Sequence, residues 1–232
     1  MAVGQEIHPP SKALWAAELP RAAWTVATWP RHRRQLAAAP RGDGRPVMLL
    51  PGLFNSDRSN FVLRRFLNGL GYRAVGWGLG RNLGARMVGT DGERVIAAIE
   101  ALVAEAGPVT LIGVSLGGIV ARLVAHQRPE LARQVVTISS PFAGSGKATN
   151  VWRAFELITG ERLDDPAVAA RSALIAGPLP VPSAAIWSRS DGLVNGTICR
   201  DEAGEAIEVR SSHLGVQVKP EVLLAVARVL AA

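Results

Sequence analysis

Cysteine is nearly absent from this chain of 232 residues, because Cys199 is the only one. A single cysteine excludes an intramolecular disulfide and a zinc site built from cysteines. Long apolar runs are also missing: no segment approaches about 18 uninterrupted apolar residues, so we expect nothing that spans a membrane. The first twelve residues hold two prolines and a glutamate instead of the apolar run of a secretory signal. We therefore expect a cytoplasmic protein, or a secreted one if a leader has been removed.

Lysine is also scarce, since Lys12, Lys147 and Lys219 are the only ones, and arginine carries most of the net charge of +7. Such a charge can attract nucleic acid or an anionic membrane, or it can simply be solvated. The cations are scattered apart from the Arg-His-Arg-Arg cluster at 31–34, and no nucleic-acid-binding module is visible. We therefore expect solvated surface charge and no nucleic-acid partner.

Apolar and glycine content indicate a folded α/β protein: 48% of the residues are hydrophobic and 24 are glycine. The length suits one domain with a single sizeable core. Segments of helical periodicity alternate with short apolar runs, which lie at 47–50, 72–77, 109–114, 134–139, 183–187 and 207–210. This alternation predicts an α/β fold with a mostly parallel sheet of about six strands and helices on both faces.

Two segments depart from that alternation. Residues 1–45 are expected to form an N-terminal helical arm, in which Pro30 ends the second of two short helices. Residues 142–182, within the main domain 46–232, are too long for a plain crossover and are expected to form a helical lid. The arm carries residues apolar enough to pack on the core, namely Leu14, Trp15, Ala22 and Trp24. Tryptophan beside arginine is also typical of membrane-surface helices, so a weak membrane contact through the arm stays open.

The stretch around Ser115 carries the most specific pattern. An apolar strand leads into Gly113-Val114-Ser115-Leu116-Gly117, and a helix-compatible run follows. A G-x-S-x-G sequence in this context is typical of a nucleophile elbow, a turn so tight that side chains at 113 or 117 would collide with neighbouring elements. The turn presents the Ser115 hydroxyl at the carboxyl edge of the sheet and directs the Leu116 N–H at a developing oxyanion. The alternative is a glycine-rich turn whose serine only caps the helix.

A nucleophilic serine needs an imidazole to take its proton, and the chain has four histidines. His8 and His32 lie in the expected arm. His126 lies on the helix that starts at Ser115, at a distance of about 16 Å along its axis. This leaves His213, which follows a predicted strand and precedes the last helix.

The imidazole in turn needs a carboxylate to hold its tautomer. Asp191 follows the predicted strand 183–187, and Gly192 allows a turn that swings the carboxylate inward. Ser115, Asp191 and His213 thus occur in the order Ser-Asp-His, each just after a predicted strand. We interpret these three residues as a candidate catalytic triad.

Four motifs together resemble the α/β-hydrolase superfamily, in particular compact bacterial lipases and carboxylesterases. They are Pro-Gly-Leu-Phe at 51–54, Gly-Val-Ser-Leu-Gly-Gly at 113–118, Ser-Asp-Gly-Leu-Val at 190–194 and Ser-His-Leu-Gly at 212–215. The resemblance covers the chain from about residue 46 to its end. The chain departs from many members of that family at one point, where Pro51-Gly52 stands in place of His-Gly.

The resemblance implies an acyl-enzyme mechanism without a cofactor. Ser115 would be the nucleophile, His213 the base and then the acid, and Asp191 the residue that orients it. The resemblance also implies an oxyanion hole made by the backbone N–H groups of Leu116 and Leu53, with Phe54 as the alternative to Leu53.

We therefore predict a serine hydrolase that cleaves carboxylic esters of small molecules, above all lipidic or aromatic-alcohol esters, without a metal or cofactor. The acyl pocket is expected to be formed by Phe54, Trp77, Trp152, Phe155 and Ile158. An acyltransferase with the same triad and a non-catalytic binding protein that retained the fold are the alternatives, because a fold alone does not determine a function.

Overall fold

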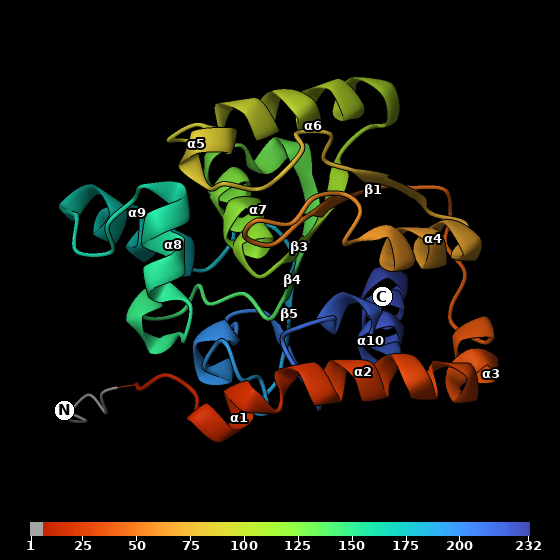
Figure 1. Cartoon of the computed structure of the whole chain (residues 1–232). Coiled ribbons are helices and arrows are strands. Elements are labelled where there is room, and N and C mark those ends of the chain that lie inside the picture. The colour runs from red at the N-terminus through yellow and green to blue at the C-terminus, as the bar shows by residue number, and fades with distance from the viewer. Residues whose placement is uncertain (1–6) are drawn as a thin grey trace.

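The structure is a computed structural model that describes residues 7–232, so residues 1–6 of the expected arm lie outside the described part. Its centre is a single sheet of six strands in the order β2-β1-β3-β4-β5-β6 (Figure 1). All neighbouring strands are parallel. The strands are β1 (Pro46–Leu50), β2 (Arg73–Gly76), β3 (Val109–Val114), β4 (Ala132–Ile138), β5 (Ser183–Trp187) and β6 (Glu205–Glu208). The predicted α/β architecture is confirmed, although β6 begins before the expected range 207–210.

Helices cover both faces of this sheet. One face packs against α3 (Arg33–Ala37), α4 (Phe61–Leu70) and α10 (Pro220–Ala231). The other face packs against α5 (Ala85–Val88), α6 (Glu93–Ala106) and α7 (Leu116–Gln127). In α6 the buried residues Val95, Ile99 and Leu102 are spaced by three and four positions, so they form one apolar stripe toward the sheet.

Strand β3 lies inside the sheet, between β1 and β4, and all of its residues are buried. A strand covered on both faces needs no polar alternation, which explains its continuous apolar run. Because all six strands run in the same direction, the loops that follow them open at the same edge of the sheet. In open α/β sheets this carboxyl edge is where ligands bind.

The arm is helical, but it packs differently from our expectation. It contains α1 (Lys12–Ala16), α2 (Glu18–Thr28), a 3₁₀ turn (Trp29–His32) and α3. The helix α2 ends before Pro30, as expected, but the 3₁₀ turn that includes Pro30 continues the helical stretch. Pro30 is tolerated there because it stands in the first turn of the 3₁₀ segment, where an N–H is not needed. Trp15 and Trp24 are 55% and 65% exposed and do not pack on the core. The other two residues expected to pack, Leu14 and Ala22, do lie on the face turned toward the protein, together with the buried Glu18 and Thr25.

The segment between β4 and β5 contains α8 (Trp152–Thr159) and α9 (Pro166–Ala176), which lie beside the sheet at the left of Figure 1. Both helices agree with the helical pieces expected within 142–182. The short helix α5 was not expected from the sequence. No helix in residues 7–232 is long and apolar enough to cross a membrane.

Candidate active site

Ser115 occupies the sharp turn between β3 and α7. Its backbone has φ 51° and ψ −120°, a conformation that non-glycine residues rarely adopt and that stores strain. The Ser115 N–H donates to the carbonyl of Ile138, and its own carbonyl accepts from Gly118 N–H. The Ser115 side chain does not cap α7. The alternative of a serine that merely caps the helix is therefore wrong.

Close packing requires Gly113 and Gly117 to be glycine. A Cβ added to Gly113 would lie 2.3 Å from backbone atoms of Gly117 and Gly118. A Cβ added to Gly117 would lie 2.2 Å from the carbonyl oxygen of Leu50. The predicted collisions are confirmed, and the turn has no space for a side chain at either position.

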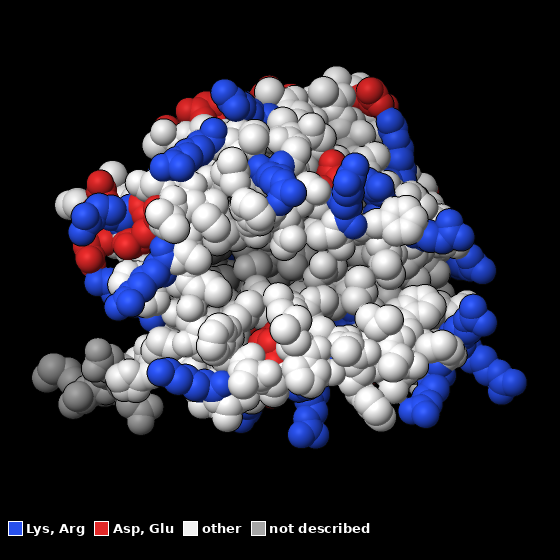
Figure 2. All heavy atoms as spheres, viewed as in Figure 1, with Lys and Arg blue, Asp and Glu red and all other residues white. Residues whose placement is uncertain are grey.

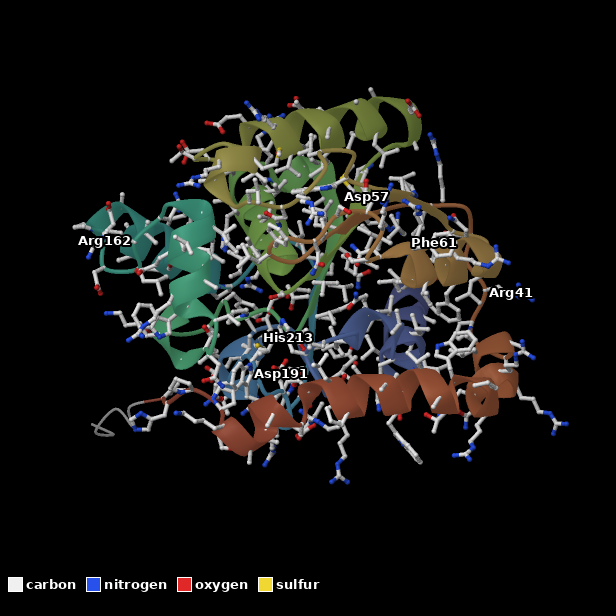
Figure 3. All side chains as sticks on the ribbon, in the orientation of Figure 1. Arg41, Asp57, Phe61, Arg162, Asp191 and His213 are labelled. Atoms are coloured by element: carbon white, nitrogen blue, oxygen red, sulfur yellow. The ribbon has the colours of Figure 1, made fainter. Side chains whose placement is uncertain are left out.

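Asp191 and His213 meet where β5 and β6 end (Figure 3). His213 Nδ1 lies 2.7 Å from Asp191 Oδ2, and Asp191 is only 2% exposed. The second carboxylate oxygen, Oδ1, accepts the N–H groups of Leu193 and Val194, both at 2.9 Å. A carboxylate accepts a hydrogen from Nδ1, which leaves Nε2 as the free, basic nitrogen. The structure therefore brings together two of the three predicted triad residues, and the carboxylate favours the tautomer that a general base requires.

The surroundings of His213 favour its protonated form. Burial by itself lowers the pKa, since a charged ring is poorly solvated there. The negative charge of Asp191 and its hydrogen bond, with the charge of Glu18, outweigh that effect, so the pKa of His213 is raised. An imidazole with a raised pKa is a stronger proton acceptor and is suited to take the proton of a serine hydroxyl.

Ser115 lies at the same carboxyl edge of the sheet, at the end of β3. Within residues 7–232, the only side-chain hydrogen bond of His213 is the one to Asp191, so Ser115 Oγ is not joined to Nε2 here. Catalytic hydrogen bonds often tighten only in the complex with substrate.

The loop after β1 passes against the elbow. A Cβ on Gly52 would lie 3.3 Å from the Cβ of Ser115. The N–H groups of Leu53 and Leu116 have no hydrogen-bond partner within the described residues. By contrast, the Phe54 N–H donates to the carbonyl of Asn82 at 2.7 Å. The expectation that Phe54 serves as an alternative oxyanion donor is therefore corrected, because its donor is already used.

A cavity of about 140 Å³ opens beside Ser115. Leu53 and Leu116 contribute to its wall, together with apolar side chains of α7, α8 and α9. The two charged residues of the wall, Glu161 and Arg171, form an ion pair with each other. Figure 2 shows a hollow near the middle of this face that is surrounded mainly by uncharged residues, with an acidic group just below it and cationic side chains above it and along the outline. The cavity is suited to an apolar group.

The expected pocket residues divide into two groups. Trp152 and Phe155 of α8 line the cavity, whereas the described side chains of Phe54, Trp77 and Ile158 do not. Trp77 is 2% exposed and belongs to the core below the sheet edge, where its Nε1 donates to a backbone carbonyl. Phe54 points outward, 53% exposed, with Arg81 stacked on its ring. Ile158 lies beside the α8 stripe formed by Trp152, Phe155 and the buried Thr159.

The remaining histidines lie elsewhere. His126 is in the last turn of α7, and burial and the charge of Arg122 lower its pKa. His32 pairs with Gln35 at the surface of the arm. No group of three or more His, Cys, Asp and Glu within residues 7–232 is placed to hold a metal ion.

Comparison with known proteins gives structural but not sequence relatives. No family model and no curated protein matches the chain. Among solved structures, an alpha/beta hydrolase enzyme, MGS-MChE2, from the sediment metagenome of the lagoon of Mar Chica, Morocco, has a TM-score of 0.53 at 21% identity, covering 81% of this chain and 90% of its own. The pyrethroid hydrolase PytH has a TM-score of 0.58 at 17% identity, with 82% and 98% covered. The monoacylglycerol lipase of Paleococcus ferrophilus has a TM-score of 0.54 at 17% identity, with 80% and 96% covered.

The chain has the α/β-hydrolase fold.

Asn82 holds the loop after β1 in this α/β-hydrolase fold. This residue was not identified from the sequence. It is fully buried, and its side-chain amide donates to the Pro51 carbonyl at 2.7 Å. Its backbone carbonyl accepts from Phe54 and its N–H donates to Asn55. Its only sequence signal was its place in a glycine-rich stretch, which does not distinguish it from its neighbours.

Proposed function

We propose that this chain is a serine hydrolase that cleaves carboxylic esters through an acyl-Ser115 intermediate. The main support is a strained serine in the wall of an apolar cavity, on the sheet edge that also carries the Asp191–His213 pair. Backbone strain persists only where the surrounding structure enforces it, and such positions cluster at functional sites. A cavity beside a nucleophile and a hydrogen-bonded base is the arrangement that acyl transfer needs.

In the proposed reaction, Ser115 Oγ attacks the acyl carbon while its proton passes to Nε2 of His213. The N–H groups of Leu53 and Leu116 stabilise the negative charge on the acyl oxygen. Asp191 keeps the hydrogen on Nδ1 and stabilises the imidazolium. The bond to the alcohol then breaks, and the imidazolium gives its proton to the leaving oxygen. Water attacks the acyl-serine in the same way, which releases the acid and restores Ser115.

The apolar wall of the cavity supports an ester with an apolar acyl part, and we keep the lipidic or aromatic-alcohol esters as the proposed substrates. Its volume of about 140 Å³ is close to that of an engineered cavity of about 150 Å³ that holds a benzene ring. We propose that short acyl groups fit without rearrangement. Residues 142–182 would then act as a lid, since longer chains require α8 or α9 to move.

The deciding experiment compares variants on p-nitrophenyl esters. Ser115→Ala and His213→Ala should each lower turnover by up to about 10⁶-fold, with melting temperatures close to that of the unmodified protein. His126→Ala is the matched control and should hydrolyse normally. Undiminished turnover in Ser115→Ala would refute the proposal. Added alcohol in the same assay measures how the acyl-enzyme divides between hydrolysis and acyl transfer.

A second proposed role is weak contact of the arm with an anionic membrane surface. The outward face of α1 and α2 exposes four large apolar side chains, Trp15, Leu19, Trp24 and Val26, by 55% to 71%. Three exposed arginines follow directly, namely Arg31, Arg33 and Arg34. Apolar side chains beside cations match the boundary between acyl chains and anionic headgroups.

A further inference from the structure

Glu18 is a buried carboxylate that the reaction proposed above does not use. It lies in the first turn of α2 and is 2% exposed. Its Oε1 accepts the N–H of Gly192 at 2.7 Å, and its Oε2 accepts the N–H of Leu214 at 2.8 Å. Gly192 directly follows Asp191, and Leu214 directly follows His213. One side chain of the arm therefore holds the backbone next to both members of the acid–base pair.

Arg21 extends this contact to the other side of Asp191. Its guanidinium pairs with Glu18 Oε1 at 2.9 Å and also donates to the carbonyl of Ser190. The backbone is thus fixed both before and after Asp191. Hydrogen bonds to charged groups are stronger than those between neutral ones, so this arrangement restricts the loop more than ordinary turn contacts would.

The arm is fitted to this loop by shape as well. A Cβ on Gly192 would lie 2.4 Å from the carbonyl oxygen of Leu14, so only glycine allows α1 to approach this closely. Gly192 has no positive φ, and close packing explains it better than the inward turn of Asp191 that we expected. Asn150 Nδ2 donates to the carbonyls of both Pro10 and Gly192, and Asn195 Nδ2 donates to the carbonyl of His8.

We propose that Glu18 is a positioning residue of the ester hydrolase: through its two main-chain hydrogen bonds it sets the relative placement of Asp191 and His213 from the N-terminal arm. This inference rests on the proposed function. Two oxygens are required, because the two N–H donors lie on different loops and each oxygen accepts one of them. The negative charge of Glu18 also helps to raise the pKa of His213. Asp191 and Glu18 are the charged groups that raise the pKa of His213, and Arg21 is paired with Glu18.

Glu18→Gln tests the proposal in the full chain. The amide keeps the shape but has one acceptor oxygen, so one of the two N–H groups would face an NH₂ donor. We expect kcat to fall by up to about 100-fold, the loss typical of a misplacement of about 1 Å. KM should change little, because Glu18 is not in the cavity wall. The acidic limb of the kcat/KM profile should move to lower pH, since a negative charge near the imidazole is lost.

Arg21→Gln is a second test, which can be used if Glu18→Gln folds poorly. It should move the acidic limb of the kcat/KM profile in the opposite direction. Arg21 is 30% exposed at its side chain, so its removal leaves less buried surface unpaired. Glu18 keeps both main-chain hydrogen bonds, but its charge is no longer balanced. The acidic limb should therefore move to higher pH. A limb that stays in place in both variants would overturn the proposal.

Asp201→Asn is the matched control. Asp201 is also buried, accepts two main-chain N–H groups and pairs with an arginine, Arg122. Its main-chain partners Ala203 and Gly204 lie in the same β5–β6 connection as Asp191, but none of its partners is next to Asp191 or His213 in the sequence. We expect a comparable loss of melting temperature without a shift of the acidic limb. An equal shift in Asp201→Asn and Glu18→Gln would mean that the effect is only structural, which contradicts the proposal.

NMR titration of the His213 ring separates failure of this inference from failure of the proposed function. The ring is assigned by comparison with His213→Ala, and its pKa should be lower in Glu18→Gln than in the unmodified protein. A lowered pKa in a protein without esterase activity would refute the hydrolase but support the coupling of Glu18 to His213. An unchanged pKa in an active esterase would overturn the inference alone.

Discussion

The protonation of His213 sets the pH at which the proposed site can work. A base must be neutral to accept the serine proton, and Asp191 and Glu18 raise the pKa of His213 despite its burial. We therefore expect kcat/KM to fall as the pH decreases, with an apparent pKa above 6.5, the ordinary value for histidine.

Asp191→Asn tests this at the level of one residue. Loss of the carboxylate should move the acidic limb to lower pH, because the protonated ring is no longer stabilised. It should also reduce kcat by about 10⁴-fold, since the amide no longer enforces the correct tautomer. Asp164→Asn removes an exposed carboxylate that pairs with Lys147, and it should leave the profile unchanged. Steady-state kinetics from pH 5 to 9 give the profiles of both variants. An acidic limb that does not move in Asp191→Asn would contradict the assignment of His213 as the base.

Helix α8 illustrates how one element divides its residues between the cavity and solvent. Phe155 lines the cavity, whereas Leu157 on the same helix is 80% exposed. In the proposed function, position 155 would therefore limit the space available to an acyl group, and position 157 would not. We therefore expect the preference for acyl chain length to depend on α8 more than on the triad.

Phe155→Ala should shift the preferred acyl chain to longer esters, because removal of the ring enlarges the cavity. Each methylene that becomes buried is worth about 0.8 kcal/mol, or about fourfold in kcat/KM. Leu157→Ala, on the same helix, should keep the chain-length profile of the unmodified protein. A series of p-nitrophenyl esters of increasing acyl length gives the comparison. An identical profile for both variants would show that the acyl group does not enter this cavity.

At the scale of the whole molecule, the arm has two different faces. Its inner face combines apolar and polar side chains and holds the loops of Asp191 and His213 through Glu18 and Arg21. Its outer face exposes tryptophans beside arginines. Asp191 and His213 lie just above α1 and α2 in Figure 3, so only these two helices would separate a surface bound by the outer face from the proposed catalytic loops.

Membrane contact is tested by sedimentation with vesicles. We expect the protein to bind vesicles that contain anionic phosphatidylserine better than neutral ones, with binding weakened by salt, because each arginine near the surface adds about 1 kcal/mol. Trp15→Ser combined with Trp24→Ser should reduce binding. Leu174→Ser, which removes a half-exposed leucine from α9, should not. Equal binding by both variants would contradict a role for the arm.

The parallel sheet, the glycine pair around Ser115 and the places of Asp191 and His213 after successive strands could be predicted from the sequence. These features depend on periodicity and turn geometry, which involve only neighbouring residues. Three other features became visible only in the folded chain: the Phe54 N–H is already bonded, Trp77 is in the core, and Glu18 reaches Gly192 and Leu214. The two hydrogen bonds of Glu18 join residues that are 174 and 196 positions apart in the sequence. No local pattern encodes them, because the packing of the whole chain selects which face of α2 turns inward.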